Sequence, residues 1–195
     1  MMIGMPGMIK AYDPKTQRAQ VECGIQRVID GNPETISVLI NVPVQFSGTA
    51  EWSVFHELPP GTEGYIHFSQ RSVDIWLDQG GPAEPLDARM FSASDAFFAP
   101  GYRSLKTVIP GLPTVGVGMS NASGSVCIHL TDNGITLRAG DQVVTLNGMG
   151  IELRTGQQVV NLTPAGLTHN MINIGNTHKH GGVMPGGGLT GFPTV

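Results

Sequence analysis

Charged residues are scarce in this 195-residue chain. Asp, Glu, Lys and Arg make up 13% of it, about half the fraction found in ordinary globular proteins. The net charge is −4, and the few Lys and Arg residues form no cluster. This pattern argues against a nucleic-acid-binding surface and against electrostatic attachment to anionic lipid. We therefore expect no nucleic acid among the partners of the protein.

Long apolar runs are also missing. No stretch of 18 apolar residues is present, so no transmembrane helix is expected. Residues 1–7 have neither the basic start nor the apolar core of a signal peptide, and we expect synthesis in a cytoplasm without export by the general secretory route. Cys23 and Cys127 lie far apart with no metal-binding spacing, which indicates two reduced thiols.

Glycine and proline are plentiful, at 27 and 14 residues, and helical periodicity is rare. The predicted fold class is therefore all-β. Residues 1–80 contain five short strand-like runs separated by turns, which suits a small barrel such as an OB-fold. The expected strands are 8–12, 18–25, 37–46, 64–68 and 72–77. Residues 81–117 are predicted to be a connector with a short helix over 87–98, because Gly80-Gly81-Pro82 breaks the chain before it.

Residues 118–170 contain a repeat. Gly118, Gly134, Gly150 and Gly166 are spaced by 16, and nine of 16 positions are identical between residues 134–149 and 150–165. Each repeat has two β-prone runs with alternating apolar residues. One such repeat cannot bury its own apolar face, whereas stacked repeats can. Four repeats from one chain still enclose little core, so we expect three chains to wind together into an intertwined trimeric β-helix (a β-prism) with Val, Ile and Leu inward.

Residues 171–195 are predicted to form an apex, with His178 and His180 as its metal ligands. In an extended segment, residues i and i+2 project from the same side, so both imidazoles can point at one spot. Two ligands are too few for a closed site, but three chains on an axis would supply six. Six nitrogen ligands suit Fe, Ni or Co better than tetrahedral Zn. With no open coordination position, such a site would be structural rather than catalytic.

Other interpretations of the histidines stay open. A pair spaced like this also arises by chance, and a Gly-rich tail would leave it idle. His169 is a second candidate inward ligand, with packing or solvent exposure as the alternative. His129 is expected on the surface of the shaft, and His56 beside Glu57 in a loop without a metal role.

The order of several motifs resembles the central spike proteins of contractile phage tails, the baseplate assembly protein V family with its gp45-like and Gp138-like membrane-piercing spikes. The motifs are Arg71-Ser72-Val73-Asp74-Ile75-Trp76, Gly80-Gly81, Asp87-Ala88-Arg89, residues 94–101, the glycine-spaced repeats and His178-Lys179-His180-Gly181-Gly182-Val183. They cover nearly the whole chain.

The resemblance implies a homotrimer with an OB-fold collar, a β-helix shaft and a pointed apex where His178 and His180 of three chains bind one iron ion. It further implies a virion protein at the tip of the tail baseplate. The N-terminal domain would dock onto tail tube, hub or baseplate proteins, and the spike would puncture the host outer membrane. No lysozyme-like domain is inserted, so no enzymatic activity is expected.

Three alternative functions remain. A receptor- or polysaccharide-binding tail tip would need an aromatic groove on the shaft, yet residues 118–165 contain no Trp, Tyr or Phe. A secretion-system spike works by the same physics. A metalloenzyme would need further ligands and a general base.

The acidic residues Asp74, Asp78, Asp87 and Asp95 are interpreted as helix caps and turn residues. The aromatic residues Trp76, Phe97 and Phe98 are interpreted as core or subunit-interface side chains.

Overall fold

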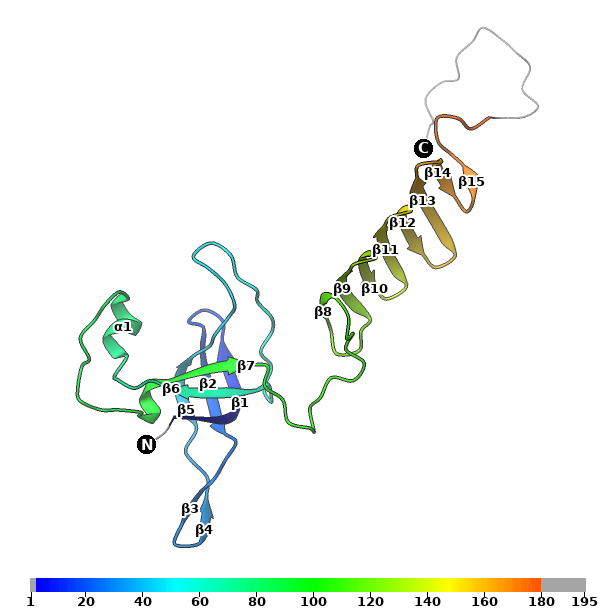
Figure 1. The fold of residues 1–195 in the computed structure, drawn as a ribbon. Helices are drawn as coiled ribbons and strands as arrows, with labels where there is room; N and C mark the ends of the chain where they lie inside the picture. The colour runs from blue at the N-terminus through cyan, green and yellow to red at the C-terminus, as the bar shows by residue number, and fades with distance from the viewer. Residues whose placement is uncertain (1–2, 180–195) are drawn as a thin grey trace. The chain divides into compact units, whose positions relative to one another are not determined.

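The computed structural model describes residues 3–179. These residues form an almost purely β structure, which confirms the predicted all-β class (Figure 1). The chain divides into an N-terminal and a C-terminal unit, with the boundary between Val108 and Ile109.

The N-terminal unit is built on a five-stranded antiparallel sheet in the order β5-β2-β1-β6-β7. Its strands are β1 (Gly4–Asp13), β2 (Arg18–Cys23), β5 (Leu39–Pro43), β6 (Glu63–Phe68) and β7 (Ala96–Pro100). The two edges of the sheet meet, because Val44 after β5 bridges Phe98 of β7, and the amide of Gln45 donates to the Phe98 carbonyl at 2.9 Å. The sheet therefore curls until its edges touch. The more specific OB-fold assignment stays a prediction.

The hydrophobic core lies inside this curled sheet. Alternate residues of a strand point to opposite faces, and the inward ones are apolar. The fully buried apolar side chains are Ile9, Val21, Val42, Ile66 and Phe98. Cys23 joins them as a free thiol, and burial raises its pKa above the ordinary value. This unit has the apolar interior that a domain needs to fold on its own.

Two elements differ from the prediction. Residues 72–77, expected as a strand, contribute to helix α1 (Asp74–Gln79), whereas residues 87–98, expected as a helix, lead into the 3₁₀ turn η1 (Ala93–Asp95) and strand β7. The position beside β6 is taken by β7, which brings the fully buried Phe98 into the core. The last strand of the sheet thus comes from the segment predicted as a connector.

Two further segments leave the N-terminal sheet. One is a hairpin of β3 (Arg27–Ile29) and β4 (Asn32–Glu34). The other is residues 44–62 between β5 and β6. Its ends are hydrogen-bonded to the sheet, and its middle stands away from the sheet as the cyan segment in Figure 1. We call it the β5–β6 loop.

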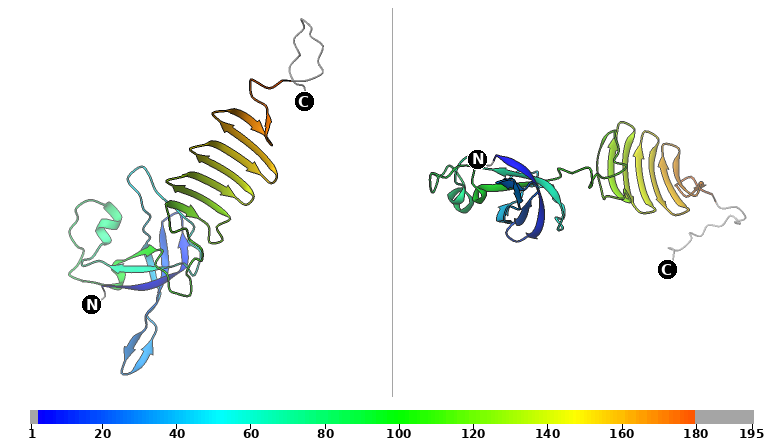
Figure 2. Two further views of the ribbon diagram at one scale, coloured as in Figure 1. Left: turned by 45° about the vertical axis from the view of Figure 1, so that its right-hand side comes forward. Right: turned by 90° about the horizontal axis from the view of Figure 1, so that it is seen from below.

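The C-terminal unit is one long antiparallel sheet in which each of eight strands pairs with the next (Figure 2). Its strands are β8 (Val117–Ser120), β9 (Val126–Thr131), β10 (Gly134–Ala139), β11 (Gln142–Asn147), β12 (Gly150–Thr155), β13 (Gln158–Thr163), β14 (Gly166–His169) and β15 (Ile172–Asn173). The 16-residue period corresponds to two strands and two turns, as the alternating apolar runs predicted.

The repeated glycines have a structural reason. Gly134, Gly150 and Gly166 begin β10, β12 and β14 with φ of +139°, +142° and +133°, which L side chains rarely adopt. A Cβ on Gly150 would lie 2.1 Å from the carbonyl oxygen of Leu162. Gly118 shares the spacing but not this conformation; Gly116, with φ of +78°, makes the equivalent approach to the Leu130 carbonyl.

Substituting Gly150 by alanine is expected to destabilise the C-terminal sheet by about 1–3 kcal/mol, because the new Cβ meets backbone in a conformation that already strains an L residue. Gly148→Ala is the matched control, since a Cβ there has no neighbour within 4 Å. Thermal unfolding of both full-length variants measures the difference. Equal midpoints for the two would contradict this account of the repeat.

Candidate functional site: the apolar face and the C-terminal end of the long sheet

The strand register gathers apolar side chains on one face of the long sheet. Successive cross-strand partners form a first row of Leu130, Ile135, Leu146, Ile151, Leu162 and Leu167. A second row of partners runs through Ile128, Leu137, Val144, Leu153 and Val160 and ends at His169. We call these two rows the apolar face. On each strand a polar residue separates the two rows, and the register joins the rows from strand to strand, so the face extends from β9 to β14 without interruption.

Within the C-terminal unit, the residues that the structure describes leave the apolar face uncovered. Leu130, Leu153 and Leu162 are 44%, 48% and 51% exposed. The buried hydrophobic core of the described residues comes wholly from the N-terminal unit. A contiguous exposed apolar surface of this kind marks an interaction site. The C-terminal unit therefore needs a second apolar surface in order to bury its own.

The opposite face of the sheet is mostly polar, although Val143 and Val159 also lie on it. One cross-strand row on it consists of Thr136, Thr145, Glu152, Asn161 and Thr168. Glu152 forms an ion pair of 2.8 Å with Arg154 on the same face. His129 also lies here, its Nε2 2.8 Å from the Val115 carbonyl oxygen. This face is suited to water.

The chain after β15 folds into a turn that fixes His178. The Asn173 side chain donates to Thr177 Oγ1 at 2.9 Å and accepts from the Gly175 amide at 2.9 Å. The Gly175 carbonyl oxygen then lies 2.7 Å from His178 Nδ1 and accepts from the His178 amide at 3.1 Å. Because a carbonyl only accepts, Nδ1 carries the proton, and a ring held in this way coordinates a metal through Nε2.

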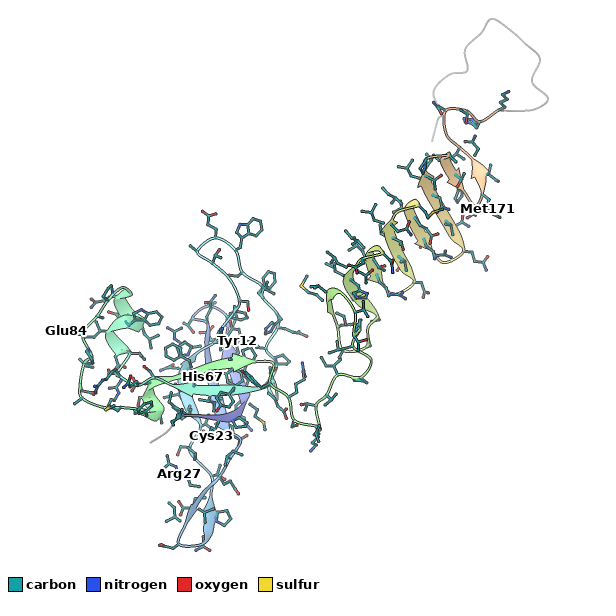
Figure 3. The ribbon with its side chains drawn as sticks, in the orientation of Figure 1. Tyr12, Cys23, Arg27, His67, Glu84 and Met171 are labelled. Atoms are coloured by element: carbon teal, nitrogen blue, oxygen red, sulfur yellow. The ribbon has the colours of Figure 1, made fainter. Side chains whose placement is uncertain are left out.

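Two other histidines were predicted as possible metal ligands, His180 and His169. His180 lies outside the described residues. His169 belongs to the apolar face, where its Nε2 is 2.6 Å from Gln158 Oε1; Asn170 donates to the same oxygen at 3.0 Å. The next turn exposes Met171 (Figure 3). Within residues 3–179, no group of three or more His, Cys, Asp or Glu side chains is placed to hold a metal ion.

Four of the motif residues in the N-terminal unit meet in one ion-pair network. Arg89 donates through Nε and Nη2 to the two oxygens of Asp95, both at 2.8 Å, through Nη1 to Asp87 at 2.8 Å, and through Nη2 to Asp74. Asp95 is fully buried and also accepts from the Val73 amide at 3.0 Å. The cap and turn roles predicted for these carboxylates were therefore incomplete, because they did not include the ion pairs with Arg89.

The network explains the charge state of its members. The Arg89 guanidinium is the main cause that holds the pKa of Asp95 below its ordinary value, against the opposing effect of burial. The three carboxylates raise the pKa of Arg89, with Asp95 the largest contributor. The network joins the start of α1 to η1 and so fixes the segment that precedes β7.

A second cluster fastens the end of the N-terminal unit to its sheet. Glu63, at the start of β6, accepts from the Ser104 amide and from Thr107 Oγ1, each at 2.6 Å. The Ser104 amide is the main cause that lowers the pKa of Glu63, followed by Thr107. Sequence analysis did not identify this cluster, because its members are some 40 positions apart and none belongs to a recognisable motif.

The remaining candidates lie near one another in the N-terminal unit. Trp76 and Phe97 stack edge-on with ring centroids 6.3 Å apart. Both line a broad groove, as do His56 and Glu57. Asp78 lies in α1.

Among the described residues, no helix has the length and apolar content to cross a bilayer.

Comparison with known families adds two matches. The family model described as phage protein Gp138 N-terminal domain matches residues 5–101. The model described as GpV Apex motif matches residues 176–194, the segment that contains His178 and His180. No curated protein matches the chain.

Proposed function

We propose, because the chain belongs to the phage baseplate spike proteins, that it is the membrane-piercing tip of a contractile tail. The N-terminal unit would dock onto the tail tube or a hub protein of the baseplate. The C-terminal end would meet the host outer membrane when the sheath contracts. The protein would act mechanically, without enzymatic activity.

The observation that carries this proposal is the uncovered apolar face of the long sheet. Three copies that turn these faces toward a common axis would bury them together and leave the polar faces in water. The result would be the intertwined trimeric shaft expected for residues 118–170. Interlocked strands with a shared core resist bending, which a puncturing device requires.

The apex, residues 171–195, would hold one metal ion per trimer through His178 and His180 of each chain. The described part of this site is compatible with a metal, because the bond from His178 Nδ1 to Gly175 orients the ring so that coordination would use Nε2. Iron is the metal that the resemblance to phage spikes implies. Such an ion would cross-link three chain ends where few apolar side chains are available to hold them.

Native mass spectrometry of the full chain tests this function. We expect a trimer with one transition-metal ion, and a His178→Ala/His180→Ala variant that stays trimeric but loses the ion. Virions carrying this variant should adsorb normally yet permeabilise the outer membrane less, because the apex is no longer cross-linked. A metal-free monomer would contradict both the trimer and the apex site.

Two other functions make different predictions. A polysaccharide-binding tail tip is disfavoured because the shaft strands at residues 118–165 carry no aromatic side chain on which a sugar could stack. A secretion-system spike would share the apolar face and the apex. Detection of the protein in purified tailed particles, and its position at the baseplate, would separate a phage spike from a secretion-system spike.

A further inference from the structure

We propose that the tip of the β5–β6 loop in each chain docks into an aromatic groove on the N-terminal unit of the next chain. This contact rests on the proposed trimer and adds a specific lock between its N-terminal units. Each chain supplies one tip and one groove, so every tip has a groove to enter.

The tip, residues 47–55, is an ordered hairpin. The backbone carbonyl of Ser47 accepts from the Val54 amide at 2.7 Å, and the backbone carbonyl of Trp52 accepts from the Thr49 amide at 2.6 Å. Thr49 Oγ1 also accepts from the Trp52 amide at 3.2 Å. A hairpin fixed by its own hydrogen bonds loses little conformational entropy on binding.

The tip presents large apolar side chains to solvent. Trp52 is 79% exposed, Phe55 is 83% exposed, and Val54 lies between them more than half exposed. Aromatic residues of this size bury roughly 150–250 Å² each when they dock. Their exposure on an ordered hairpin indicates a docking element.

The groove lies in the same unit and has a volume of about 1280 Å³. Its aromatic lining comes from Tyr12, Phe46, Phe55, Trp76 and Phe97. Tyr12 and the lining residue His67 are labelled in Figure 3. Of the two exposed aromatic side chains of the tip, Phe55 also lines the groove of its own chain, whereas Trp52 does not. The groove of one chain therefore has room for the Trp52 side chain of another.

The size of the contact favours a second copy over a separate protein. Two docked aromatic side chains bury about 300–500 Å², well below the roughly 1,200 Å² of a stable independent interface. Such a contact suits chains that another interface already holds together. The apolar face of the long sheet supplies that other interface in the proposed trimer.

The groove offers one cation to the tip, Arg18, and its lining also carries Glu57. Glu51 directly precedes Trp52 at the tip, and Arg18 is the only Lys or Arg among the described residues that line the groove. Within its own chain, Arg18 donates to the Thr16 carbonyl at 3.3 Å. A tip-into-groove contact joins two different surfaces, and three such contacts can close into a ring.

Cross-linking of the full-length Glu51→Cys/Arg18→Cys double variant with a short bismaleimide tests the contact. We expect covalent trimers to account for most of the protein on a denaturing gel. The two single variants should give only background, which also controls for the native Cys23 and Cys127. A trimer in solution that yields no interchain cross-link would overturn the docking while leaving the spike function intact. The same result is expected if the tip folds into the groove of its own chain or binds another baseplate protein. A monomer in solution would overturn both proposals.

Fluorescence provides an independent readout, because Trp52 is the only tryptophan left in a Trp76→Phe variant. Trp52 should be shielded from acrylamide in the assembled protein, and adding Phe97→Ala in the groove should increase its quenching several-fold. Quenching as strong as that of free tryptophan without the groove substitution would contradict the docking.

Discussion

Replacing Val144 with aspartate is expected to abolish the proposed trimer and leave monomeric chains. Val144 lies in the second row of the apolar face, between its cross-strand partners Leu137 and Leu153. In the proposed trimer the substitution would bury three unpaired carboxylates, each at a penalty on the order of several kcal/mol. Sedimentation velocity of the full chain measures the change in mass.

The preceding residue supplies a matched control. Val143 lies on the polar face, where its two cross-strand partners are Arg138 and Arg154. An aspartate at Val143 would stand between two cations in contact with water, so Val143→Asp should remain trimeric. The N-terminal unit has its own core and shows by its unfolding transition that the Val144 variant is otherwise intact. Trimers in both variants, or monomers in both, would contradict the assignment of the two faces.

Replacing Asp95 with alanine is expected to destabilise the N-terminal unit by about 3 kcal/mol. The substitution removes the buried partner of Arg89 and the acceptor of the Val73 amide, and breaking a buried ion pair from one side is strongly unfavourable. Asp87→Ala is the control, because Asp87 contacts Arg89 from a half-exposed position where an ion pair contributes about 1 kcal/mol or less. Urea unfolding at neutral pH measures both.

The Asp95 contribution should also depend on pH. Because Arg89 lowers the pKa of Asp95 in the folded protein, the carboxylate is easier to protonate in the unfolded chain. The ion pair therefore contributes fully above the ordinary aspartate pKa of 3.8 and is lost as the pH falls through the lower, folded-state pKa. The difference between wild type and Asp95→Ala should shrink in that acid range. A difference that stays constant there would contradict the charge-based account.

The C-terminal sheet could be predicted from the sequence because local signals decide it. Glycines at positive φ mark the starts of β10, β12 and β14, and two-residue alternation separates the faces. The N-terminal unit depends more on distant contacts. The Val73 amide is captured by a carboxylate 22 residues away, and β7 takes the place beside β6 that local alternation had suggested for residues 72–77.

The candidate site was also predictable only in part. The spacing of His178 and His180 drew attention to the apex, and the structure adds the Gly175 contact that orients His178. The role of Arg89 was not predictable from spacing, because its partners Asp74, Asp87 and Asp95 surround it only after α1 and η1 have formed.

The near identity of two successive repeats has a consequence for assembly. Residues 134–149 and 150–165 place the same apolar side chains at nearly every position of the two rows. Three chains shifted against one another by one repeat would still match leucine to leucine along most of the shaft. The apolar face alone would therefore allow several alignments of the three chains, which differ by shifts of 16 residues. In the proposed trimer, the correct alignment would have to come from parts of the chain that do not repeat. We therefore expect the N-terminal units of three chains to associate first and the shaft to assemble from there toward its C-terminal end.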